Sequence, residues 1–168
     1  TWLLDIVNNV SIPATLLRGR ALARVGATGP AGAAFIGAQQ EIEARLREGA
    51  EHAGVHANLA FVHAGLGRKE AALAAACRAT DLLPIARDTL DGTYYLACLA
   101  KIEAQLGEVD SAVNHIEQLL AAPAGHEVSV AALRTDPAWD PLRDEPRFRK
   151  LLVDADPAVV VAARKPPI

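Results

Sequence analysis

Two stretches of the chain follow the same pattern, and this repeat limits the fold more than any other feature. The first runs from His56 to Pro84 and the second from Leu96 to Pro123. Each contains an amphipathic stretch, a Leu-Gly pair, a second amphipathic stretch and a closing Pro. One such unit cannot bury its apolar face alone, so neighbouring units must stack. The pattern therefore predicts an all-α array of antiparallel helix pairs.

Glycine and small residues recur at matching places in the two units. Ala72 and Ala112 each lie five residues after a glycine, Gly67 or Gly107. Glycine adopts the left-handed conformation that ends a helix and lets the chain reverse. Alanine lets the paired helices approach closely. Further core positions are predicted one and two turns later, at Ala76, Ala79, Ile116 and Leu119.

This pattern resembles the tetratricopeptide repeat, a helix–turn–helix unit of roughly 34 residues. The resemblance implies a right-handed α-solenoid with a short C-terminal helical cap. It places one repeat at 53–86, another at 93–125 and a degenerate one at 12–51. The turn of the degenerate repeat is loosened by the sequence GATGPAG, Gly26 to Gly32. Residues 1–11 are predicted as the end of a preceding helix, 126–155 as a capping segment and 156–168 as a tail.

The charged stretch DPAWDPLRDEPRFRKLL, Asp136 to Leu152, is interpreted as the end of the array. Each of its three acid–proline pairs predicts a helix start, because the acid accepts from free N–H groups and proline suits the first turn. These pairs are Asp136-Pro137, Asp140-Pro141 and Glu145-Pro146. An apolar set should cover the exposed end of the last repeat, namely Trp139, Leu142 and Phe148.

Composition excludes several classes of partner. The formal net charge of −3 provides no basic surface for nucleic acid or anionic lipid. No apolar run reaches the ~18 residues of a membrane span, so no membrane insertion by this segment is expected. Cys77 and Cys98 are interpreted as small buried residues. The chain begins with Thr1 and contains no Met, which is typical of a piece of a longer protein.

No motif for catalysis or for a cofactor is present in the sequence. Residues 26–32 lack the Lys-Ser/Thr of a phosphate loop, and no Gly-x-Ser-x-Gly occurs. We therefore expect no enzyme and no cofactor in this segment, although a catalytic domain upstream is left open. A stripe of His52, His56 and His63 has a spacing that zinc could use. Packing of these histidines between helices is the competing interpretation.

The resemblance also implies a concave surface lined by the first helix of each pair. Its expected partner-binding residues are Asn58, Phe61, Tyr94, Lys101 and Gln105. Aromatic side chains with polar neighbours are typical of interaction hot spots. The alternative is that Phe61 and Tyr94 only complete the packing between helices.

The repeat and the tail together are similar to the C-terminal repeat region of certain bacterial signalling proteins. In those proteins the repeats follow a protein-kinase, adenylate-cyclase or winged-helix DNA-binding domain. The resemblance implies a non-catalytic scaffold for a protein or peptide partner. It implies a cytoplasmic location, or a periplasmic one if a membrane span precedes the repeats. Two alternatives stay open: self-association of the parent protein, and a small-ligand or metal sensor.

Overall fold

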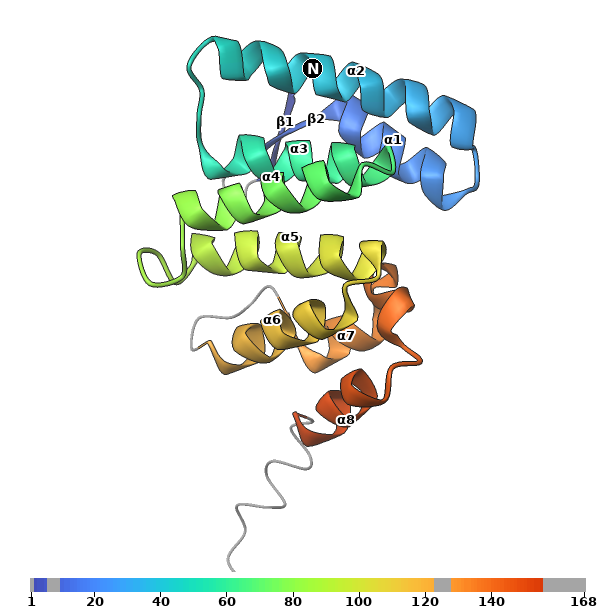
Figure 1. The fold of residues 1–168 in the computed structure, drawn as a ribbon, viewed down its shortest axis with the longest axis vertical. Helices are drawn as coiled ribbons and strands as arrows, with labels where there is room; N and C mark the ends of the chain where they lie inside the picture. Colours follow the sequence, from blue (N-terminus) through green and yellow to red (C-terminus); the bar gives the residue numbers. More distant parts are fainter. Residues whose placement is uncertain (1, 6–9, 123–127, 156–168) are drawn as a thin grey trace, which may run out of the picture.

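The computed structural model describes residues 2–5, 10–122 and 128–155, and these are mostly helical (Figure 1). Six longer helices are α1 Ala14–Arg24, α2 Thr28–Arg47, α3 Ala53–Gly65, α4 Lys69–Leu82, α5 Asp91–Leu106 and α6 Val109–Ala121. Three short elements follow: α7 Val130–Thr135, the 3-10 helix η1 Pro137–Leu142, and α8 Pro146–Asp154. The predicted all-α class is confirmed, with one short β-hairpin beside the helices.

The six longer helices form three successive pairs. Within each pair the helices are joined by a short turn and pack against each other, α1 on α2, α3 on α4 and α5 on α6. Successive pairs are in contact through α2 with α3 and α4 with α5, while α3 also contacts α5. Figure 1 shows the resulting elongated stack, with α7 and α8 at the end opposite α2.

The turns within the pairs depend on glycines in the left-handed conformation. The φ angles of Gly26, Gly67 and Gly107 are 74°, 70° and 80°. Residues with a Cβ atom adopt this region at a cost, so glycine is favoured there. The prediction of left-handed glycines at Gly67 and Gly107 is confirmed.

The alanines predicted for the core are buried. Ala72 and Ala112 have no exposed surface, and Ala76 and Ala79 have 1% each. Ile116 and Leu119 are buried as well, at 0% and 1%. The small side chains on α4 and α6 therefore bring the paired helices into close contact, as the repeat pattern indicated.

The cap covers the last helix pair with three large side chains. Trp139, Leu142 and Phe148 are buried and belong to the same apolar cluster as residues of α5 and α6. Their predicted packing against the last helix pair is confirmed. Asp136 begins η1 and accepts a hydrogen bond of 2.9 Å from the Ala138 amide.

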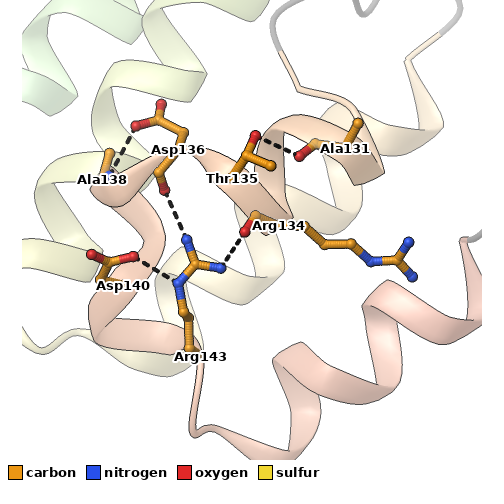
Figure 2. A network of polar contacts seen from close by, with 7 residues as sticks. All are labelled: Ala131, Arg134, Thr135, Asp136, Ala138, Asp140 and Arg143. Atoms are coloured by element: carbon orange, nitrogen blue, oxygen red, sulfur yellow. Dashed lines mark hydrogen bonds and ion pairs between the residues drawn. The ribbon is translucent and has the colours of Figure 1, made fainter.

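Figure 2 shows that Arg143 interacts with three other residues of the cap, Arg134, Asp136 and Asp140. The Arg143 guanidinium donates to the Arg134 carbonyl at 2.5 Å and the Asp136 carbonyl at 3.4 Å. Its Nε pairs with the Asp140 carboxylate at 2.6 Å. Arg143 thereby fixes the end of α7 to the path of η1.

Asp140 does not start a helix, so that prediction is wrong. It lies inside η1, which continues through Pro141 to Leu142. The φ of proline is close to that of a 3-10 helix, and a short 3-10 segment needs few amide donors. Pro141 is therefore accommodated within the element.

The prediction of a helix over residues 1–11 is also wrong for the part that the structure describes. Strand β1, Trp2–Asp5, pairs antiparallel with strand β2, Val10–Pro13, with Trp2 opposite Pro13 and Asp5 opposite Val10. The β-branched residues Val10 and Ile12 alternate with Ser11, which suits a strand with one covered face. Val10 is 2% exposed and Ile12 packs against the apolar core.

The loose turn predicted at Gly26 to Gly32 is shorter than expected, because α2 already begins at Thr28. Pro30 lies in the first turn of α2, where its missing N–H would have no partner within the helix. The glycines at 29 and 32 are accommodated in the same helix.

The two cysteines differ in exposure. Cys98 is buried, as predicted, but Cys77 is exposed, and both are free thiols. Helix α4 turns Ala72, Ala76 and Ala79 toward the core, which leaves Cys77 on its outer side.

Some predictions cannot be compared with the structure. Pro123, the start of the predicted cap at 126–127 and the tail at 156–168 lie outside the described residues. Among the described helices, none combines the length and the apolar character needed to cross a membrane.

Candidate functional site

A cleft of about 240 Å³ lies between α1 and η1, and we call it the α1–η1 cleft. It is lined by residues of α1, α2, α3, α5 and η1. Each of the three helix pairs therefore contributes at least one helix, while α4 and α6 contribute none. The lining residues are Arg20, Ala23, Arg24, Phe35, Phe61, Lys101, Gln105, Asp136, Pro137, Ala138 and Pro141.

The α1 side of the cleft carries two exposed arginines. Arg20 and Arg24 are one helical turn apart, so both face the same side of α1. The Arg20 guanidinium lies 4.5 Å from the centre of the Phe61 ring. Within the described part of the chain, neither arginine forms an ion pair with a carboxylate. Both guanidinium groups can therefore bind a ligand, while the charge of Arg20 also acts on Asp136 without a direct ion pair.

The η1 side of the cleft is different because its charges are already paired. The Lys101 ammonium lies 3.2 Å from the Asp136 carboxylate and 5.6 Å from the centre of the Trp139 ring. Burial of Asp136 opposes its ionisation, but the Ala138 amide, Lys101 and the charge of Arg20 together outweigh burial and lower the pKa of this carboxyl. Asp136 therefore stays charged at neutral pH and neutralises Lys101.

Three of the five residues predicted for the groove lie together in this cleft. They are Phe61 from α3, and Lys101 and Gln105 from α5. Phe61 is half-buried and contacts two apolar clusters, so its packing role and its place in the cleft coexist.

The other two predicted residues lie elsewhere. Asn58 is 3% exposed and donates from Nδ2 to the Ser11 carbonyl of β2 at 2.8 Å. Tyr94 packs against Tyr95 with ring centres 5.2 Å apart, next to a small apolar cluster. Neither side chain lines the α1–η1 cleft.

The sequence-based prediction missed the residues that α1 and η1 contribute. Arg20 and Arg24 have the i, i+4 spacing of one helix face, on the first helix of the degenerate repeat. That spacing could have predicted that both arginines lie on one face of the helix. Nothing local indicated Asp136 or Pro137, because only the packing of η1 on α5 brings them to the cleft.

The histidine stripe does not form a metal centre in the described residues. No group of three or more His, Cys, Asp or Glu side chains there is arranged to hold a metal ion. His56 Nε2 lies 3.7 Å from Glu51 Oε1, while His63 Nδ1 is buried without a hydrogen-bond partner in the described structure. Burial lowers the pKa of both His56 and His63, which favours the neutral imidazole.

His115 has a carboxylate partner that its sequence neighbours did not indicate. Its Nδ1 lies 2.7 Å from Oε2 of Glu103, a carboxylate that is 6% exposed. The pair links α6 to α5 across the last helix pair. It explains how a glutamate is accommodated in the core.

No family model, curated protein or solved structure matches this chain. Its function is therefore inferred from the geometry of the cleft and from the repeat pattern.

Proposed function

We propose that this segment is a non-catalytic scaffold that binds a protein or peptide partner in the α1–η1 cleft. One observation carries the proposal: Phe61, Lys101 and Gln105, from two helix pairs, line a single cleft with residues of α1 and η1. We propose further that the three helix pairs form a right-handed solenoid of the tetratricopeptide type.

The size and lining of the cleft support a peptide side chain as the occupant. A volume of about 240 Å³ is below the ~300–1,000 Å³ typical of small-molecule pockets. Phe61, Pro137 and Pro141 provide apolar walls, while Arg20, Lys101 and Gln105 provide polar edges. An apolar anchor with a polar rim is the usual composition of an interaction hot spot.

The setting is proposed from the resemblance alone. It is the regulatory or interaction region of a larger bacterial signalling protein, in the cytoplasm. The net charge of −3 also favours a protein partner over a nucleic acid.

Peptide display against this chain, followed by affinity measurement of the selected peptides, tests the proposal. Gln105→Trp places a larger, uncharged side chain in the cleft from an exposed position, and should weaken binding by about tenfold or more. Gln118→Trp, at another exposed glutamine on α6, is the matched control and should bind normally. Failure to select any peptide, or equal loss in both variants, would contradict the proposal.

Self-association is the second candidate, because exposed apolar side chains gather near one end of the chain. Five of the seven exposed large hydrophobic residues among those described precede residue 37: Leu3, Leu4, Leu17, Val25 and Ile36. Exposed apolar side chains that lie next to one another are typical of contact sites. Sedimentation velocity across a concentration range tests it, with Ile36→Glu expected to abolish any dimer.

A further inference from the structure

The α1–η1 cleft is a positive site on a negative protein. Its lining includes three basic side chains, Arg20, Arg24 and Lys101, and one acidic side chain, Asp136. The formal net charge of the chain is −3. Local potential, more than net charge, decides which ligands a concave site attracts. The cleft therefore favours an anionic group.

The positive charge is concentrated at one side of the cleft. Lys101 is paired with Asp136 at 3.2 Å on the η1 side, so little net charge remains there. Arg20 and Arg24 form no ion pair with any carboxylate among the described residues. A guanidinium can bind both oxygens of a carboxylate at once. An acidic group should therefore bind at the α1 side.

The middle of the cleft is apolar. Phe61, whose ring centre lies 4.5 Å from the Arg20 guanidinium, Pro137 and Pro141 are apolar residues of its lining. An apolar side chain next to the acidic group would contact these residues and exclude water from the ion pair. Such exclusion strengthens a charged interaction relative to one fully exposed to water.

We infer that the α1–η1 cleft recognises an acidic peptide segment, with a carboxylate at Arg20 and Arg24 and a neighbouring apolar side chain against Phe61 and the two prolines. This inference rests on the proposed function and names the chemistry of its partner. Although Lys101 is paired with it, Asp136 still repels an anion in the cleft, and it repels a doubly charged phosphate more strongly than a singly charged carboxylate. A phosphopeptide is therefore the competing ligand in the test.

Fluorescence anisotropy with three labelled peptides provides the test. The probe alternates leucine and glutamate, and its two counterparts replace glutamate with glutamine or with lysine. The glutamate peptide should bind at least about tenfold tighter than either counterpart. Its affinity should fall as salt is added, because salt screens exposed ion pairs. Inorganic phosphate at the same ionic strength should compete no better than chloride.

Arginine variants locate the acidic group. Arg24→Ala should weaken binding of the glutamate peptide by about tenfold. Arg18→Ala is the matched control, since Arg18 is an exposed arginine of the same helix that does not line the cleft. Asp136→Asn keeps an oxygen that can accept from the Ala138 amide but removes the charge, so it should tighten binding several-fold.

The outcomes separate this inference from the proposed function. If peptides selected by display bind and Gln105→Trp weakens them, but the glutamate and glutamine peptides bind alike or not at all, the acidic inference fails and the proposed function stands. If no peptide binds in either experiment, both fail. Strong competition by inorganic phosphate would also overturn the inference, in favour of a phosphorylated partner.

Discussion

At the scale of single residues, the Phe35 ring is packed so closely that its neighbours cannot be enlarged without strain. Its ring lies between Gly19 of α1 and Gly65 of α3, where an added Cβ would come within 2.8 Å and 2.4 Å of ring atoms. We predict that Gly65→Ala lowers the free energy of unfolding by about 1–3 kcal/mol through overpacking. Chemical denaturation followed by circular dichroism measures the change.

Gly32→Ala in α2 is the control, since a Cβ there meets nothing within 4 Å. Alanine has the higher helix propensity, so this variant should gain up to about 1 kcal/mol of stability. Equal effects of the two substitutions would show that the ring does not need the space at Gly65.

His63 makes the stability of the fold depend on pH. Burial lowers the pKa of His63 in the folded state, so the unfolded state binds the proton more readily. Stability is therefore greatest above the ordinary histidine pKa of about 6.5 and decreases as the pH falls below it. His63→Gln should reduce this decrease, measured as the change in Tm between about pH 7.5 and pH 5.

His56 has the same direction of shift and should contribute a similar loss on acidification. Burial is the largest cause of this shift and the charge of His52 a smaller one, so His52→Gln should reduce the contribution of His56 only in part. An unchanged pH dependence in the double variant of His56 and His63 would contradict this explanation.

At the scale of elements, the cap depends on Arg143. Arg143→Ala removes the bonds to the Arg134 and Asp136 carbonyls and the pair with Asp140. We predict a loss of about 1–2 kcal/mol, together with faster amide exchange in η1. Arg18→Ala should change neither quantity, because no hydrogen bond or ion pair joins the exposed Arg18 side chain to the cap among the residues that the structure describes. Amide exchange in η1 as slow as in the wild type would contradict a clamping role for Arg143.

The helix pairs were predictable because their signals are local. A glycine at each reversal and alanines at helical spacing determine where the chain turns and which face it buries, and Gly67, Gly107, Ala72 and Ala112 all behave as expected. The hairpin of β1 and β2 was not predicted, because the charges and apolar residues of the first strand fit a helix end equally well in the absence of its partner.

The hairpin of β1 and β2, which was not predicted, also explains why the prediction for Asn58 was wrong. Asn58 lies at a helix position that was expected to face the concave surface, but β2 covers it and accepts its hydrogen bond. Phe61, Lys101 and Gln105 lie beyond the hairpin and line the cleft. Residues from η1 join them only through long-range packing, which no local pattern encodes.

At the scale of the whole molecule, the cleft depends on distant parts of the chain being held together. Its lining residues extend in sequence from Arg20 of α1 to Pro141 of η1. The apolar clusters that connect them meet at Phe61, which contacts both. A substitution that destabilises the packing of α1 or η1 should therefore weaken ligand binding, even when it changes no residue that touches the ligand.

The most direct test of the account is to map a bound peptide by changes in amide NMR shifts. A peptide selected by display should perturb amides of α1, α3, α5 and η1 around the α1–η1 cleft, and leave β1 and the outer side of α2 unchanged. Perturbations centred on Leu3, Leu4 and Ile36 would contradict binding in the cleft. Shifts there that depend on protein concentration without any peptide would favour self-association instead.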